Sequence, residues 1–264
     1  MRKKLFTSLL LLCVLQSSCQ QPLSCPVGAR ATGSGHSGIV HEDLWGAFNN
    51  QAAVASLKNI QAGVFLENRF LVDEMNRIAT ALYLPLNSGG IIISVDHFGS
   101  FIYSEMKAGL GYSMQMAKLF SAGVQLDFLQ MSIGEGYGKY LAVTFEGGML
   151  AKLTEKLKLG IHVINPINTK WIGTEEQIPS VIRGGFGYKP ESSLELYAEV
   201  HKSTNNPVIF CAGTEYRYHE KFFIRAGITS GPSRYTFGAG FMIKSLKLDI
   251  SSSVHSWLGY SPQL

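Results

Sequence analysis

Apolar residues alternate with polar, small or glycine residues along most of the chain from residue 59 onward. In residues 120–128, one side of the alternation is Phe120, Ala122, Val124, Leu126 and Phe128, and the other is Ser121, Gly123, Gln125 and Asp127. Residues 194–201, 222–229 and 235–244 repeat the pattern. A period of two is typical of β-strands, because successive side chains of a strand point to opposite faces. The pattern therefore predicts an all-β fold in which each strand has one apolar face.

Thirteen segments carry this pattern, and most of them are ten residues or longer. They are 59–70, 77–86, 90–99, 107–116, 118–133, 139–151, 157–165, 179–189, 193–203, 207–218, 221–230, 234–244 and 245–258. Strands in soluble domains usually have about five or six residues, whereas a tilted strand that crosses a membrane needs about nine to eleven. The lengths therefore favour strands that span a membrane.

The connections between these segments also differ in character. Residues 117–118, 154–156, 190–192 and 219–221 are tight and polar, whereas residues 134–139 and 166–179 form longer loops. Short turns on one rim and longer loops on the other are typical of bacterial outer-membrane barrels. We therefore predict a transmembrane antiparallel β-barrel.

A soluble β-sandwich or a lipocalin-like barrel would show the same alternation, with the apolar face buried inside. Two observations favour the inverted arrangement, in which the apolar face meets lipid. Only 16% of the residues are charged, and a soluble surface is normally much richer in charge. Aromatic residues also gather near the strand ends, as a membrane girdle requires: Tyr103, Tyr112, Tyr137, Tyr140, Trp171, Tyr188, Tyr216, Tyr218, Phe222, Tyr235 and Trp257.

Residues 1–19 have the order of a secretory signal peptide: basic residues at 2–4, an uncharged run at 5–15 and small residues before Gln20. We predict cleavage after Cys19, and localisation of the exported chain in the outer membrane of a Gram-negative bacterium. An alternative treats Cys19 as a lipidated first residue, but Gln16 stands where lipidation favours an apolar residue.

The signal peptide also accounts for most of the positive charge. The whole chain has a formal net charge of +4, and removal of the three basic residues at 2–4 leaves 20 positive against 19 negative residues. Nucleic-acid binding therefore loses its electrostatic support. Cys25 and Cys211 remain after cleavage, but two cysteines form neither a disulfide framework nor a zinc-ligand spacing.

If Val124 and the residues in phase with it face lipid, the charged residues of the opposite phase face the lumen. The main candidates are Asp127, Glu146, His162, Arg183, Glu195, Glu199, Glu215, Arg217 and Arg225. They could line a polar conduit or a binding cavity, but we favour a lumen held together by ion pairs. Glu215 and Arg217 lie two residues apart, so they share a face and could belong to one ion network.

Several local motifs suggest chemistry without the context that it requires. Gly33, Gly35 and Gly38 match the spacing of a dinucleotide-binding loop, but no strand precedes them and no βαβ unit surrounds them. We interpret them as a glycine-rich lead into a short helix. The group His36, His41, Glu42 and Asp43 is interpreted as a solvated turn that faces the periplasm, not as a metal site. We predict no catalytic residues, no metal and no cofactor, and hence no enzyme.

A family resemblance rests on the first part of the predicted mature chain. Residues 28–38 read GARATGSGHSG, and they are followed by HEDLW at 41–45 and NNQAA at 49–53. This opening resembles that of the PorV/PorQ group of Bacteroidetes outer-membrane proteins, which are similar to FadL-like barrels. Those proteins have Asn-Pro-Ala where this chain has Asn-Gln-Ala. Residues 255–260 also resemble the start of that family's closing hairpin. The resemblance implies fourteen strands over residues 59–264, and a helical plug at 20–58 tucked into the lumen.

The number of strands is a point of tension. Bacterial barrels have an even number of strands, whereas the alternation gives thirteen, and the chain stops at Leu264 where a closing strand is expected to begin. Either a strand is overlooked or the reading frame is truncated, and the sequence favours neither explanation.

Two functions remain, both with outer-membrane lipid around the barrel. The first follows the FadL-like resemblance and is the passage or binding of a hydrophobic or amphipathic solute. The second follows the PorV/PorQ resemblance and is a structural or shuttle role in a type IX-like secretion pathway, with secretion-system proteins as partners. A wide lumen or a lateral opening favours the first, and a lumen filled by the N-terminal segment and paired charges favours the second.

Overall fold

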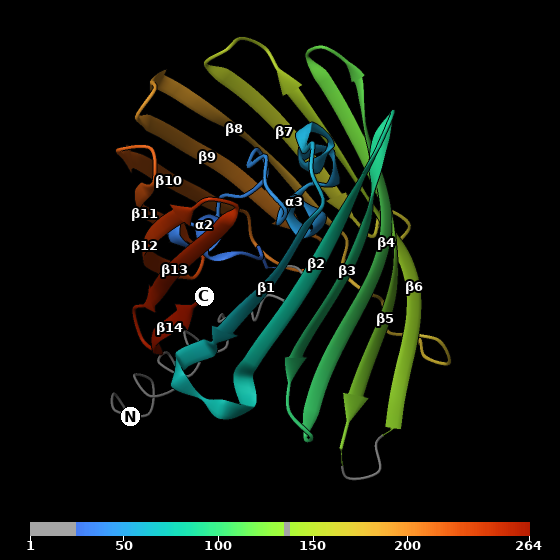
Figure 1. Ribbon diagram of the computed structural model, residues 1–264. Helices are drawn as coiled ribbons and strands as arrows, with labels where there is room; N and C mark the ends of the chain where they lie inside the picture. Colours follow the sequence, from blue (N-terminus) through green and yellow to red (C-terminus); the bar gives the residue numbers. More distant parts are fainter. Residues whose placement is uncertain (1–24, 135–137) are drawn as a thin grey trace.

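The computed structural model describes residues 25–134 and 138–264, and its strands form a closed antiparallel barrel (Figure 1). Fourteen strands pair in the order β1-β14-β13-β12-β11-β10-β9-β8-β7-β6-β5-β4-β3-β2. Each strand therefore lies beside its neighbour in the sequence, and β14 returns to β1. The predicted fold class, an antiparallel barrel of about fourteen strands, is confirmed.

Most strands have eight or more residues and most connections are short, with the longest ones between β7 and β8 and between β1 and β2. Their bounds are β1 Gln61–Asn68, β2 Asn76–Leu86, β3 Gly89–Gly99, β4 Tyr103–Ala117, β5 Phe120–Ile133, β6 Gly138–Lys152, β7 Leu157–Ile164, β8 Val181–Glu191, β9 Leu194–Ser203, β10 Ile209–Tyr218, β11 Phe222–Ser230, β12 Ser233–Ile243, β13 Leu246–His255 and β14 Gly259–Gln263. Two single-turn 3-10 helices, η3 Arg69–Leu71 and η4 Asp73–Met75, lie between β1 and β2.

The fourteenth strand is the one that the alternation missed. The predicted segment 245–258 contains β13 and the turn after it, and β14 then adds five residues. Strand β14 pairs with β13 along its whole length and with β1 at Glu67 and Gln263. Leu66 and Leu264 exchange two backbone hydrogen bonds of 2.9 Å, N–H to C=O in each direction. This short seam closes the barrel.

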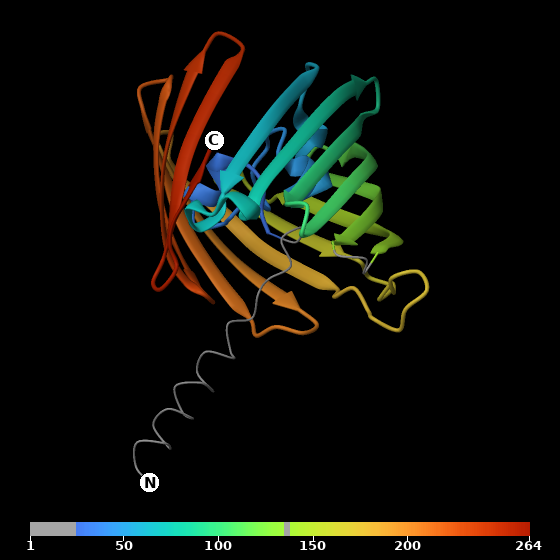
Figure 2. The same ribbon diagram turned by 90° about the horizontal axis from the view of Figure 1, so that it is seen from below.

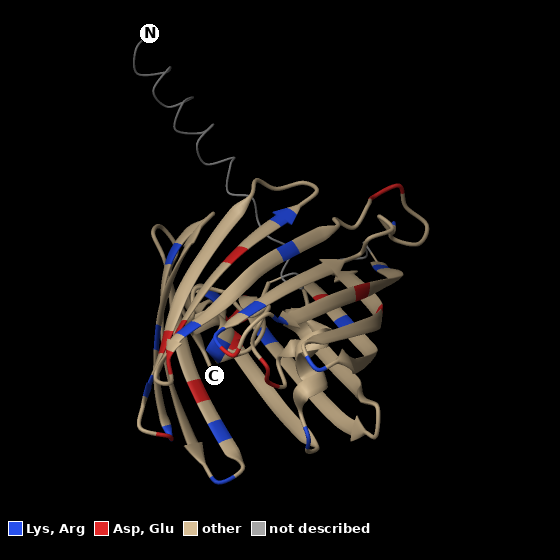
Figure 3. Ribbon diagram, turned by 90° about the horizontal axis from the view of Figure 1, so that it is seen from above, with Lys and Arg blue, Asp and Glu red and all other residues tan. Residues whose placement is uncertain are grey.

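The two faces of the wall differ in polarity as the alternation predicts. In β5, Val124, Leu126 and Phe128 are exposed on the outside, whereas Gln125 and Asp127 are buried inside. The other strands largely repeat this arrangement, and many of their acidic and basic side chains are buried inside. Figure 3 shows how these charged positions are distributed along the strands around the ring. An apolar outer surface of this extent is solvated by lipid, not by water.

Most of the predicted girdle aromatics are exposed, but Trp171 and Tyr140 are not, and the half-buried Tyr140 packs against the same inner cluster as Trp171. Tyr112, Tyr188 and Tyr235 are exposed on the outer face, and Trp257 is 91% exposed in the β13–β14 turn. Trp171 is only 5% exposed. Its assignment to the girdle is wrong, because the β7–β8 loop runs beside β6, where the Ile172 N–H donates to the Leu141 carbonyl, and the Trp171 ring packs inward against Leu129 and Ala142. Tyr137 lies outside the described residues.

Residues 25–57 lie inside the barrel, and we call this segment the plug (Figure 2). It contains the short helices α2 (Ala29–Gly33) and α3 (Gly46–Asn49) and the 3-10 helix η2 (Gln51–Ser56). The predicted signal peptide and its cleavage site fall outside the described residues. Among the described helices, none has the length and apolar character needed to span a bilayer.

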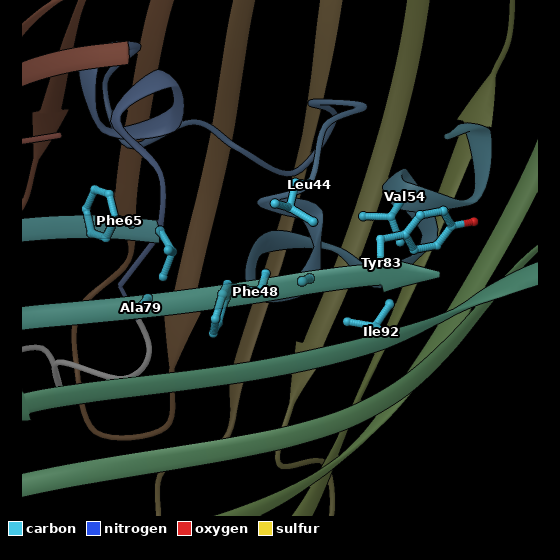
Figure 4. Close-up of a cluster of buried hydrophobic side chains, with 10 residues drawn as sticks. Leu44, Phe48, Val54, Phe65, Ala79, Tyr83 and Ile92 are labelled. Atoms are coloured by element: carbon cyan, nitrogen blue, oxygen red, sulfur yellow. The ribbon is translucent and has the colours of Figure 1, made fainter. Parts of the chain in front are cut away.

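An apolar cluster holds one side of the plug against β1, β2 and β3. Figure 4 shows Leu44, Phe48 and Val54 of the plug beside Phe65 of β1 and Tyr83 of β2. Each of these side chains is at most 7% exposed. The lumen therefore contains a hydrophobic core of its own, which is enclosed by the wall and separate from the apolar outer surface.

A charge on the outer face tests the assignment of inside and outside. Leu126 and Phe237 are 57% and 58% exposed at mid-strand, so Leu126→Arg or Phe237→Arg should destabilise the barrel in lipid by about 2–4 kcal/mol. Urea unfolding in lipid vesicles measures this loss. Trp257→Arg, at the rim, is the matched control and should cost about 0–1 kcal/mol. Equal stability of the mid-strand and rim variants would contradict the assignment.

Candidate functional site: a plugged lumen

Glycines in the wall allow the plug backbone to touch the strands directly. A Cβ added at Gly213 of β10 would overlap the carbonyl group of Ser34, and one at Gly227 of β11 would overlap the backbone of Gly35. These two wall glycines are direct neighbours in the β10–β11 register. Together they leave a gap in the inner face of the wall into which the plug backbone fits, and we call this gap a seat. The side chain of any larger residue at either position would occupy it.

A second seat lies across the lumen. A Cβ at Gly123 of β5 would approach the Gln51 carbonyl carbon to 2.5 Å, and one at Gly148 of β6 would overlap the Asn50 side chain. Gly123 and Gly148 are again paired in register. Part of the glycine enrichment on the inner face therefore has a steric cause, because the plug occupies the space that side chains would otherwise take.

Two of the three glycines with dinucleotide-loop spacing, Gly33 and Gly35, lie at the first seat, whereas Gly38 packs against Asn49 and Ala31 within the plug. Gly33 ends α2 and lies against Gly238 of β12, and Gly35 has a positive φ of 71°. The Gly35 N–H donates to Thr236 Oγ1 at 2.9 Å, and that hydroxyl donates to the Gly33 carbonyl at 3.0 Å. Gly33 and Gly35 therefore contact the barrel wall, where the absence of a side chain allows the plug backbone to fit against the strands.

Arg30 connects the plug to the wall by the densest ion network of the lumen. Its Nε and Nη2 donate to the two carboxyl oxygens of Glu215 at 2.9 and 2.8 Å, and its Nη1 donates to Asp43 at 3.2 Å. Arg225 also bonds Glu215, at 2.5 Å, and Asp249 at 2.7 Å. Burial opposes the charge of Arg30, but Glu215, Tyr197 and Asp43 outweigh it and raise the Arg30 pKa.

Glu42 makes the second ionic contact between plug and wall. Lys152 of β6 and Lys158 of β7 lie 2.5 and 2.6 Å from its two carboxyl oxygens. Burial alone would raise the Glu42 pKa, but the two lysines lower it. The prediction of a solvated, periplasm-facing turn is wrong, because His36 and His41 are buried and the two carboxylates pair with basic residues.

The third contact centres on Glu146. It accepts hydrogen bonds from Lys107 Nζ at 2.8 Å and from Gln51 Nε2 of the plug at 2.8 Å, and it lies 3.0 Å from His162 Nε2. Asp127 lies on the neighbouring strand, where its Oδ1 accepts from Gln125 Nε2 at 2.8 Å. Its Oδ2 is buried without a hydrogen-bond partner.

The other predicted lumen residues occupy three environments. Arg183 and Glu199 are buried inside, where Glu199 accepts the Ile39 N–H of the plug at 2.7 Å. Glu195 is half-buried and lies 3.6 Å from Arg30. Arg217 is exposed near the turn end of β10, with its guanidinium 5.6 Å from the Phe223 ring centre. The suggested ion pair between Glu215 and Arg217 is not formed. Glu215 instead pairs with Arg30 of the plug and with Arg225 of β11.

Three important residues are absent from the predicted lumen set. Lys107 has the same phase as the glycines of β4, opposite to Leu110 and Tyr112, so the alternation could have placed it inside. Arg30 and Gln51 lie in the plug, where no periodic pattern assigns a direction to a side chain. Their partners are 185 and 95 residues away in the chain, and no local signal identifies such pairs.

A small cavity remains between the inner faces of β4, β5 and β6 and the β7–β8 loop. It holds about 30 Å³ and is lined by Leu129, Trp171 and Ile178 on its apolar side, and by Lys107 and Asp127 on its polar side. The Asn165 side chain fixes the inward loop, since its Nδ2 donates to the Ile178 carbonyl at 2.7 Å and its Oδ1 accepts from Thr144 Oγ1 at 2.8 Å. The space is too small for a benzene ring, which a cavity of about 150 Å³ accommodates.

No protein-family model matches the sequence, and no curated protein matches it either. Solved structures do match the fold. The Ralstonia pickettii toluene transporter TbuX has a TM-score of 0.70 at 12% identity, over 90% of this chain and 96% of that chain. The P. putida toluene transporter TodX has a TM-score of 0.69 at 11% identity, over 90% and 95% of the two chains.

A Pseudomonas aeruginosa FadL homologue is also similar, with a TM-score of 0.64 at 12% identity, over 90% of this chain and 94% of that chain. At these identities, the likeness concerns the fold. The chain has the fold of FadL-type barrels.

The glycine seat predicts a strong contrast between two single-methyl changes. Gly213→Ala should displace the plug at Ser34 and destabilise its seated state by about 1–3 kcal/mol, as overpacking does. Gly184→Ala, on the outer face of β8, meets nothing within 4 Å and should leave the plug in place. Limited proteolysis at residues 25–57 of the folded barrel measures the difference. Equal protection of both variants would show that the seat does not hold the plug.

Two buried histidines predict that the plug is less stable in acid. Burial, together with the positive charge of Arg234 for His36 and of Arg30 for His41, lowers both pKa values well below 6.5. Below about pH 6.5, both histidines of a released plug take up protons, whereas those of the seated plug do not. The free energy that holds the plug in place therefore falls as the pH falls, by at most about 1.4 kcal/mol per pH unit for each histidine.

His41 offers the cleaner test, because neither ring nitrogen has a hydrogen-bond partner among the described residues and the ring packs edge-on against Tyr197 at 4.5 Å. His41→Phe should match the wild type in melting temperature at pH 8 and exceed it at pH 5. A variant that loses as much stability in acid as the wild type would exclude His41 as a source of the pH effect.

Proposed function

We propose that this protein is an outer-membrane barrel that admits a hydrophobic or amphipathic solute. Solved structures with the same fold include toluene transporters and a monoaromatic hydrocarbon channel. The observation that carries the proposal is the cavity beside the β7–β8 loop, which combines an apolar side with a charged side, here called its floor. An apolar enclosure with a few convergent polar groups is typical of small-molecule sites.

Entry of a solute requires the β7–β8 loop to lift. Trp171 and Ile178 are each 5% exposed and pack against Leu129 and Ala142. The loop side chains therefore occupy most of the apolar space that a solute would use. Since longer loops lie on the extracellular rim of outer-membrane barrels, this entrance faces the outside of the cell.

Passage beyond the cavity requires the plug to move. Gln51 bonds Glu146 directly below the cavity, and the two glycine seats leave no space between plug and wall. The contacts of Arg30, Glu42 and Gln51 are ionic or hydrogen-bonded and can exchange one at a time, so a local shift of the plug is compatible with a stable barrel.

A partner-binding role in secretion or surface attachment is the second candidate. The filled lumen favours it, because a barrel that only presents surfaces to other proteins needs no open channel. The two candidates differ in one respect that can be measured: solute passage depends on plug movement, and partner binding at the rims does not.

A disulfide staple between plug and wall separates the two functions. Thr32 Oγ1 and Ser251 Oγ lie 2.8 Å apart, so Thr32→Cys with Ser251→Cys should oxidise readily, in a background with Cys25 and Cys211 changed to Ser. In vesicles, the stapled barrel should admit toluene at a small fraction of the wild-type rate, and a reducing agent should restore uptake.

Each single-cysteine variant in the same background is a control for the substitutions themselves, because it cannot form the staple. Uptake that is fast in the wild type and unchanged by the staple would exclude passage past the plug. No uptake of any apolar solute by the wild type above empty vesicles would count against transport and leave the partner-binding candidate.

A further inference from the structure

The floor of the cavity has an excess of carboxyl groups. Glu105, Lys107, Asp127 and Glu146 are its charged lining residues. The one ammonium group already has a partner, because Lys107 Nζ donates to Glu146 at 2.8 Å. Glu105 accepts from the Tyr103 hydroxyl at 2.5 Å. A ligand with a carboxylate or phosphate would therefore meet repulsion here, and no unpaired cation in the described lining would offset it.

Asp127 provides an unused hydrogen-bonding position on this floor. Its side chain is fully buried, its Oδ1 accepts from Gln125 Nε2, and its Oδ2 has no partner. A buried polar atom without a partner destabilises the protein. A ligand group that bonds this oxygen would remove that destabilisation, and the favourable energy would add to apolar burial.

The opposite side of the cavity indicates the shape of the ligand. Trp171 places an aromatic ring among Leu129, Ala142 and Ile178. The ring is carried by the β7–β8 loop, which is bonded to β6 at this point by the Ile172 N–H and the Leu141 carbonyl at 2.8 Å. The ring can leave once that bond opens. A flat aromatic solute could take the place of the Trp171 ring.

We propose that the cavity binds a hydroxylated aromatic solute, with its ring in the place of Trp171 and its hydroxyl group bonded to Asp127 Oδ2. This inference rests on the proposed function and specifies its substrate class. A hydroxyl group can both donate and accept, so it satisfies Asp127 in either protonation state. An unsubstituted hydrocarbon fills the apolar side only, and an aromatic carboxylate is repelled by the floor.

The test uses three ligands with the same ring and side chain: para-propylphenol, propylbenzene and para-propylbenzoate. Calorimetric titration into the barrel in lipid nanodiscs, with empty nanodiscs as blank, should show the phenol binding about tenfold more tightly than propylbenzene, as one hydrogen bond to a buried carboxyl group allows. The benzoate should bind most weakly. Trp171→Ala should tighten binding of the phenol, whereas Ile172→Ala, exposed on the same loop, should not.

Substitutions at Asp127 then assign the preference to this residue. Asp127→Leu removes the acceptor and should reduce the phenol to the affinity of propylbenzene, with propylbenzene itself unchanged. Asp127→Asn keeps an acceptor without a charge, so it should retain the phenol preference and weaken the discrimination against benzoate. Asp73→Asn, an exposed change in the β1–β2 connection, controls for net charge and should match the wild type.

The outcomes separate this inference from the proposed function. If phenol and propylbenzene bind equally, or if benzoate binds best, the inference is overturned while solute binding stands. If none of the three ligands binds to the wild type or to Trp171→Ala, the proposed function fails as well. Should Asp127→Leu fail to assemble, the Asp127→Asn result decides, since loss of the phenol preference in that variant would also contradict the inference.

Discussion

The polar groups inside the barrel need partners, and this requirement governs the rest of the structure. The outer faces of the strands are largely apolar, so most charged side chains of the strands point into a narrow lumen. Burial of an unpaired charge is costly, whereas a charge that is paired and hydrogen-bonded is tolerated. Cross-strand pairs such as Arg77 with Asp96, at 2.6 Å, meet part of this requirement. The plug meets much of the rest through Arg30, Glu42 and Gln51.

The plug can provide these partners only because the wall gives it space. Paired glycines on β10 and β11, and on β5 and β6, allow backbone to approach backbone, and this brings the plug side chains within hydrogen-bonding distance of the wall. Steric fit and charge pairing thus depend on each other. A seat without ion pairs would leave Glu215 and Glu146 short of partners, and ion pairs without a seat could not form at these distances.

Much of the barrel could be predicted from the sequence, because the side-chain period of a strand is a local property. The alternation around Val124 and Phe237 identifies both the strands and their faces. It failed at β14, where five residues that include Pro262 are too few to show a period. The environment of Trp171 was also predicted wrongly. An aromatic residue near a strand end is expected in the girdle, but the sequence does not indicate whether the loop that carries it turns outward or inward.

The site was less accessible to sequence reasoning, for a physical reason. The phase of the alternation assigns Asp127 and Glu146 to the inner face, but it does not indicate what they bond. Arg30 meets Glu215 across 185 residues, and Gln51 meets Glu146 across 95. These contacts depend on barrel closure and on the path of the plug, which are global properties of the fold.

The central claim is that residues 25–57 are a fixed part of the folded barrel. Hydrogen exchange of the backbone amides, measured by mass spectrometry on the barrel in nanodiscs, tests it most directly. Plug amides such as those of Gly35 and Ile39, which bond the wall, should be protected to an extent comparable with the amides of β5 and β6. Exchange of the plug at the rate of an unstructured peptide, with the strands still protected, would contradict the account.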